Sequence, residues 1–93
     1  MTAGDPLLVE IRDLVEAVAG PRRVPSHVGP ETRLSEGGFW LDSIELLQVV
    51  VACEERFAIV FDPTRELTAS ALETLESLSA LIRTKGARIS GAP

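Results

Sequence analysis

Few side chains in this sequence could take part in chemistry, and the one hydroxyl that stands out is Ser43. It directly follows Asp42, at the predicted start of an apolar helix. Catalysis needs a nucleophile with a base, paired carboxylates, a metal cluster or a phosphate-binding loop. The chain has only one histidine, His27, and one cysteine, Cys53, with no glycine-rich phosphate loop. We expect a solvated His27, a Cys53 packed in the core, no metal site and no enzyme activity.

Ser43 has two possible roles. Serine at the beginning of a helix commonly caps a free backbone N–H group, which would make it purely structural. Asp42, however, already offers a capping carboxylate, and the helix that follows has more apolar surface than one packed face requires. We therefore interpret Ser43 as a position where a group is attached, and helix capping stays open as the alternative.

The helix predicted for residues 43–57 has two apolar arcs when its residues are placed 100° apart. The arc assigned to the core consists of Leu46, Val49, Val50, Cys53 and Phe57. The second arc consists of Ile44, Leu47 and Val51, beside Gln48, Glu54 and Glu55. From Leu34 to Glu55 the chain has five acids and no lysine or arginine. The second arc is thus either an ordinary solvated face or, as we prefer, a docking face for partners with basic patches.

The elements before this helix should hold it in place. Asp5 and Pro6 are typical of a helix start, and Gly20-Pro21 of its end. The apolar residues between them recur with helical spacing: Leu7, Leu8, Ile11, Leu14, Val15 and Val18. Residues 20–41 form a long loop, which we expect Leu34 and Phe39 to anchor in the core.

The elements after this helix are shorter. We expect an extended segment that tucks Ile59 or Phe61 into the core, because no second strand is available to pair with it. Thr68 should cap a short helix at residues 69–72, and Thr74 should begin the last helix, which ends near residue 85. The inward residues of that helix are Leu75, Leu78, Leu81 and Ile82. Residues 86–93 are expected to be a flexible tail. The pattern predicts an all-α fold.

Length, composition and charge exclude several classes of protein. A chain of 93 residues makes one small domain. A net charge of −5 argues against nucleic acid as a partner, because phosphate binding needs clustered lysine and arginine. No apolar run approaches the ~18–20 residues that span a membrane, and the first residues lack the positive region of a signal peptide. We expect a cytoplasmic monomer with no membrane association.

The residues Leu41-Asp42-Ser43-Ile44, between a long loop and an apolar, acidic helix, resemble the phosphopantetheine attachment site of acyl carrier proteins. The usual family motif is Asp-Ser-Leu, whereas this chain has Asp-Ser-Ile. The order of the helices corresponds over residues 1–85. The resemblance implies a four-helix bundle with a short third helix and a long loop between the first and second helices.

The resemblance also implies a function. Ser43 would receive 4′-phosphopantetheine from coenzyme A through a phosphopantetheinyl transferase that uses Mg²⁺, with Asp42 assisting. The arm would carry acyl groups as thioesters. The face shared by the transferase and by acyl-loading, ketosynthase- or transferase-type enzymes would comprise Ile44, Glu45, Leu47, Gln48, Val51, Glu54 and Glu55.

The pathway is predicted from features in which this chain differs from a fatty-acid carrier. The bulky Phe39-Trp40 pair, Arg56 near the end of the helix, and the long connection 61–72 favour polyketide or other secondary metabolism. A carrier of an amino, hydroxy or other small acid is the alternative within the family. The alternative of another class is a small helical interaction module without a prosthetic group.

Overall fold

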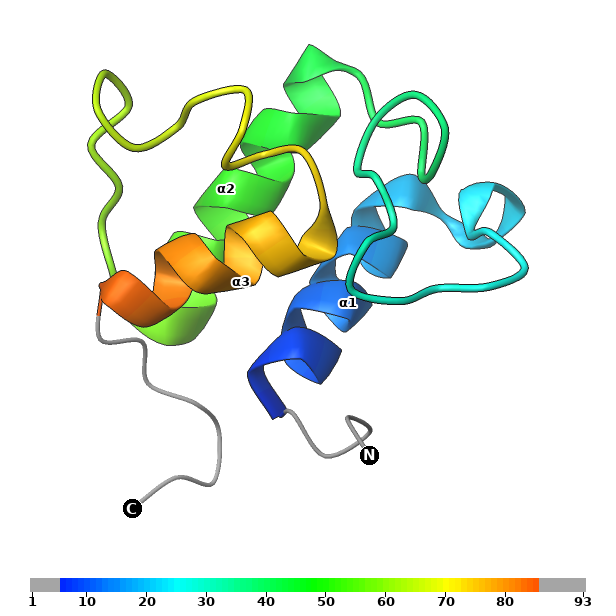
Figure 1. Ribbon diagram of the computed structural model, residues 1–93, viewed down its shortest axis with the longest axis horizontal. Helices are drawn as coiled ribbons and strands as arrows, with labels where there is room; N and C mark the ends of the chain where they lie inside the picture. Colours follow the sequence, from blue (N-terminus) through cyan, green and yellow to red (C-terminus); the bar gives the residue numbers. More distant parts are fainter. Residues whose placement is uncertain (1–5, 86–93) are drawn as a thin grey trace.

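The computed structural model describes residues 6–85, and it is helical throughout its regular structure (Figure 1). Its α-helices are α1 (Pro6–Ala19), α2 (Ser43–Phe57) and α3 (Leu75–Thr84), and a short 3-10 helix, η1 (Pro21–Arg23), follows α1. Within residues 6–85 there is no β-strand, and an isolated bridge pairs Arg33 with Thr74. The all-α prediction is confirmed. The described residues contain three α-helices where four were expected.

Helix α1 is the element against which the other two helices pack. Its buried side chains are Leu7, Ile11, Val15 and Ala19, with Leu8, Leu14 and Val18 half-buried beside them. The helix ends where Gly20 adopts a φ of 85°, a conformation that glycine accepts without a steric penalty. The predicted end at Gly20-Pro21 is confirmed, whereas the predicted Asp5 cap lies outside the described residues.

Helix α2 begins and ends with specific caps. Asp42 is the N-cap residue and forms a reciprocal capping box with Glu45. At the other end Ala58 is left-handed, with a φ of 55°, and its N–H donates to the Glu54 carbonyl. Val49, Val50, Cys53 and Phe57 are buried, and Leu46 is half-buried against them. The boundaries and the core arc predicted from the sequence are confirmed.

Helix α3 is fixed by a second capping box, in which the Thr74 hydroxyl accepts from the Ser77 N–H at 3.1 Å. As predicted, its inward side includes the buried residues Leu75, Leu78 and Ile82. Leu81, also predicted to face inward, is half-buried. Lys85, just after the helix, forms an ion pair with Glu66 at 2.9 Å. This pair ties the end of α3 to the connection that leads into it.

The loop from residue 24 to residue 42 is held by buried anchors and by backbone hydrogen bonds. Leu34 and Phe39 are fully buried, as predicted. The Phe39 N–H donates to the Arg33 carbonyl at 3.0 Å, which folds the loop back on itself. Gly38 lies inside this fold, where an added Cβ would come within 1.9 Å of the Arg33 carbonyl oxygen. Only glycine fits there.

The connection from residue 58 to residue 74 is extended and then turns. Ile59 and Phe61 are both buried, which confirms the predicted anchoring of this segment. The predicted helix at residues 69–72 is wrong: this stretch is a single turn. Thr68 still caps it, because its hydroxyl accepts from the Ala71 N–H at 3.1 Å. The Arg33–Thr74 bridge follows directly after this turn. A helix here would therefore have only one turn, which is too short to offset the entropy cost of helix nucleation.

The predicted tail at 86–93 lies outside the described residues. Within residues 6–85, none of the helices has the length and apolarity needed to cross a membrane.

Candidate functional site

Ser43 is the first residue of α2, and its side chain is exposed to solvent. The cap that serine might have supplied comes from Asp42, whose Oδ1 accepts from the Glu45 N–H at 2.8 Å. In return, Glu45 Oε1 accepts from the Asp42 N–H at 3.1 Å. No hydrogen bond within residues 6–85 uses the Ser43 hydroxyl. The hydroxyl is therefore not required for capping and is accessible to a reagent.

The backbone around Ser43 offers further donors. The first N–H groups of an α-helix have no partner within the helix. In α2 the Glu45 N–H donates to Asp42 Oδ1 and the Leu46 N–H to the Asp42 carbonyl at 2.9 Å. Among the hydrogen bonds of the described residues, none uses the N–H of Ser43 or Ile44. Together with the helix dipole, these two N–H groups favour an anion at this end of α2.

Arg23 from η1 stabilises the beginning of α2. Its guanidinium pairs with both carboxylate oxygens of Glu45, with Nη1 at 2.8 Å from Oε1. It also donates to the carbonyls of Ala19, at 3.0 Å, and Trp40, at 3.2 Å. One side chain thus joins the end of α1, the long loop and the first turn of α2.

This pairing changes the acidity of both groups. The hydrogen bond from Arg23, assisted by the Asp42 N–H, lowers the pKa of Glu45 to about 2. The hydrogen bond with Glu45 raises the pKa of Arg23 above its usual value. Sequence reasoning did not find Arg23, because an arginine in a loop 22 residues away from its partner forms no local pattern.

The second apolar arc of α2 faces solvent. Ile44, Leu47 and Val51 are 67%, 59% and 50% exposed. They line a shallow depression of about 400 Å³ together with Gln48, Ala52 and Glu55. The predicted apolar stripe is therefore a real surface, and it starts one residue after Ser43.

The acids predicted to surround this stripe fall into two groups. Glu45 is engaged by Arg23, and Glu54 accepts from the Phe61 N–H at 2.9 Å. Both carboxylates therefore hold the fold together. Glu55 is exposed at the rim of the stripe, and Asp42 is exposed as well, although its carboxylate also caps α2.

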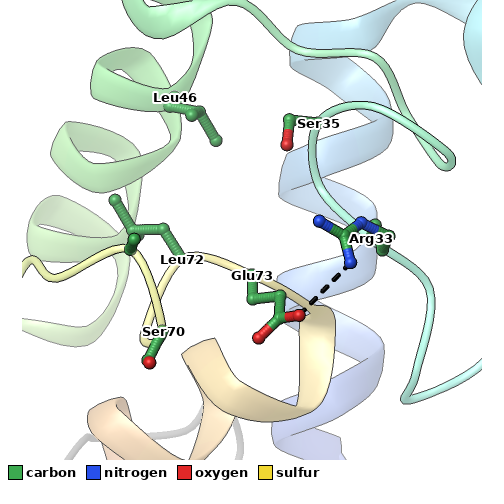
Figure 2. Close-up of a pocket in the computed structure, with 7 residues that line it drawn as sticks. Arg33, Ser35, Leu46, Ser70, Leu72 and Glu73 are labelled. Atoms are coloured by element: carbon green, nitrogen blue, oxygen red, sulfur yellow. Dashed lines mark hydrogen bonds and ion pairs between the residues drawn. The ribbon is translucent and has the colours of Figure 1, made fainter.

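A second depression, of about 440 Å³, lies beside α2 on the side of Leu46 (Figure 2). Its apolar surface comes from Leu46, Ala69 and Leu72, and its polar surface comes from two serines and an ion pair. The ion pair joins Arg33 and Glu73 at 3.2 Å across the depression. Leu46 is the lining residue that belongs to α2, and it lies about one helical turn from Ser43.

Cys53 and His27 lie in the environments predicted for them. Cys53 is fully buried, and burial raises the pKa of its thiol to about 12. His27 is exposed. Within residues 6–85, no cluster of histidine, cysteine and acidic side chains could hold a metal ion.

Comparisons with known proteins returned no matching family model, no matching curated protein and no matching solved structure.

Proposed function

We propose that this chain is an acyl carrier protein that holds acyl groups as thioesters on a 4′-phosphopantetheine arm attached to Ser43. The observation that carries the proposal is the state of Ser43 at the beginning of α2. Its hydroxyl is exposed and free of hydrogen bonds within the described residues, because Asp42 has taken over the cap.

The attachment reaction needs little from the carrier beyond an accessible hydroxyl. The Ser43 oxygen would attack the phosphorus next to pantetheine in the pyrophosphate of coenzyme A. One P–O bond forms, the pyrophosphate bond breaks, and adenosine 3′,5′-bisphosphate leaves. The hydroxyl proton passes to a base of the transferase, whose Mg²⁺ neutralises the phosphates. The free N–H groups of Ser43 and Ile44 suit the resulting phosphodiester.

The chain's own thiol cannot serve as the acyl carrier. A thiolate is the reactive form, and a buried Cys53 with a pKa of about 12 is almost entirely protonated at neutral pH. When bound, the arm supplies an exposed thiol that forms thioesters. This division of roles is consistent with a domain that supplies the scaffold and no catalytic groups of its own.

Partner enzymes would dock on the exposed stripe of Ile44, Leu47 and Val51. Its rim carries Gln48 and Glu55, and the exposed Asp42 comes two residues before Ile44 in the chain. An apolar centre with an acidic rim suits basic patches on the transferase and on acyl-loading, ketosynthase- or transferase-type enzymes. Glu45 and Glu54 would contribute through the shape of α2 rather than through direct contact.

We also propose that the fold is a four-helix bundle of the acyl-carrier type, in which the turn after Thr68 takes the place of the short third helix. For the cargo we favour polyketide or other secondary metabolism. The depression beside Leu46, with a guanidinium, a carboxylate and two hydroxyls in its lining, suits a short, polar acyl group. It equally suits the alternative cargo, an amino, hydroxy or other small acid.

A thiol titration under native conditions tests the carrier role. The unmodified chain should react very slowly with a maleimide or an aromatic disulfide, because its thiol is buried. After incubation with coenzyme A, Mg²⁺ and a promiscuous phosphopantetheinyl transferase, followed by gel filtration, one rapidly reacting thiol per chain should appear. A Ser43→Ala variant should gain none. A wild-type chain that gains no fast thiol would refute the proposal.

The same titration separates the second candidate, a helical interaction module whose exposed stripe binds a partner helix. That candidate is favoured by the stripe itself, which would serve it without any role for Ser43. It predicts no new thiol, and it predicts that Ser43→Ala leaves partner binding unchanged.

A further inference from the structure

Trp40 lies at an unusual position near the end of the long loop, three residues before α2 begins at Ser43. Its neighbours Phe39 and Leu41 are buried, with 0% and 4% of their surface exposed, whereas Trp40 is 58% exposed. The alternation is set by the backbone: the Phe39 N–H donates to the Arg33 carbonyl and the Leu41 N–H to the Leu34 carbonyl, both at 3.0 Å. Because both neighbours point inward, residue 40 is displayed outward.

The backbone of Trp40 is in a conformation that disfavours tryptophan. Its φ is 60°, in the left-handed region where a Cβ crowds the backbone and where glycine has no such penalty. Its N–H donates to the Ser35 carbonyl at 2.9 Å, and its carbonyl accepts from Arg23 at 3.2 Å. The loop therefore imposes this conformation on whichever residue stands at position 40.

Within residues 6–85, no hydrogen bond or ring contact holds the indole of Trp40 in place. Glycine would satisfy the backbone better, and the exposed ring leaves a large apolar surface in water. Ala58 is the other non-glycine residue with positive φ within the described residues, and there the side chain is only a methyl group at the end of α2. A bulky residue at an unfavourable backbone position indicates a role outside the fold.

We infer that Trp40 is a docking anchor for the enzymes that act at Ser43, and that it enters an apolar socket bordered by arginine or lysine on the partner. This inference rests on the proposed function. Ser43 is three positions after Trp40 in the chain, so their Cα atoms lie within about 11 Å of each other. The nearby exposed acids Glu36 and Asp42 favour basic groups on the partner. Cations also stack favourably on indole rings, and tryptophan is enriched among the residues that dominate binding at interfaces.

The test compares Trp40→Gly and Trp40→Phe with wild type, using coenzyme A, Mg²⁺ and a promiscuous phosphopantetheinyl transferase as the partner probe. For Trp40→Gly we expect kcat/KM toward the carrier to fall at least ten-fold, through a higher KM with little change in kcat. Its Tm should be equal to or above that of wild type, because the strained φ is relieved. Trp40→Phe should retain an intermediate kcat/KM, because part of the aromatic surface remains.

Ala58→Gly is the matched control, since it relieves the same backbone conformation far along the chain from Ser43. It should raise Tm or leave it unchanged and should leave kcat/KM at the wild-type value. Modification of Trp40→Gly as efficiently as wild type would overturn the inference, as would a loss that is accompanied by a lower Tm in both Trp40 variants. A wild-type chain that accepts no phosphopantetheine would instead refute the proposed function, and the inference with it.

Discussion

The two faces of α2 are both apolar but lie in opposite environments. Val49, Val50 and Phe57 on one face are no more than 5% exposed, whereas Ile44, Leu47 and Val51 on the other are at least 50% exposed. The hydrophobic core includes residues of the first face and none of these three residues of the second. Hydrophobic residues alone therefore do not define the core of this helix. The face that the fold leaves unused begins beside Ser43, and this position is what connects the surface with the proposed function.

The largest effect should come from removing the biggest side chain of the buried face. Phe57→Ala should lower the free energy of unfolding by about 3–5 kcal/mol, because it leaves a cavity at the end of α2. Urea unfolding followed by circular dichroism measures this change. A loss below about 1 kcal/mol would show that the face is not the core.

Val50 and Val51 are adjacent, identical residues on the two faces of α2. Val50 is 5% exposed and Val51 is 50% exposed. Val50→Ala should destabilise the protein by about 2 kcal/mol, whereas Val51→Ala should change stability by less than about 0.5 kcal/mol. Transferase-catalysed modification of Ser43 should slow only for Val51→Ala. Equal effects on stability would contradict the division of α2 into two faces.

Glu54 and Glu55 offer a second adjacent pair. Glu54→Ala should cost about 1–2 kcal/mol, because the Phe61 N–H loses its acceptor. Glu55→Ala should leave stability unchanged and should lower the modification rate, with the difference from wild type disappearing at high salt. Kinetics at low and high ionic strength check this. If Glu55→Ala is modified as fast as wild type at low salt, Glu55 takes no part in docking.

The smallest predicted effect concerns Glu45, in the first turn of α2. The pKa of Glu45 is lowered to about 2 in the folded chain from an ordinary value of 4.5. Its contribution to stability is therefore complete above about pH 4.5 and is lost as the pH falls toward 2. The Tm difference between wild type and Glu45→Gln should shrink over this range. A constant difference would mean that Glu45 is not held as a carboxylate by Arg23.

The sequence predicted those parts of the molecule that are local in the chain. Helical periodicity located α1, α2 and α3, and Asp42 and Thr74 were identifiable as caps from residue type and spacing. The exposed stripe followed from counting apolar arcs. Each of these features depends on residues within a few positions of one another.

The features that the sequence did not predict depend on contacts between distant segments. Arg23 reaches Glu45, and the loop at Arg33 bridges to Thr74, neither of which has a local pattern. The prediction of a helix after Thr68 was wrong. The predicted cap at Thr68 is present, but the chain enters the Arg33–Thr74 bridge after a single turn. The strained backbone of Trp40 was also invisible, since it results from hydrogen bonds on both sides of the residue.

The central claim is that Ser43, and no other residue, carries the prosthetic group. Its most direct measurement is the intact mass of wild type, Ser43→Ala and Ser70→Ala after incubation with coenzyme A, Mg²⁺ and a promiscuous phosphopantetheinyl transferase. Ser70 is an exposed serine in the turn before α3 and serves as the matched control. Wild type and Ser70→Ala should each gain one phosphopantetheine, and Ser43→Ala should gain none. A wild-type mass that stays unchanged, or a Ser43→Ala mass that rises, would contradict the claim.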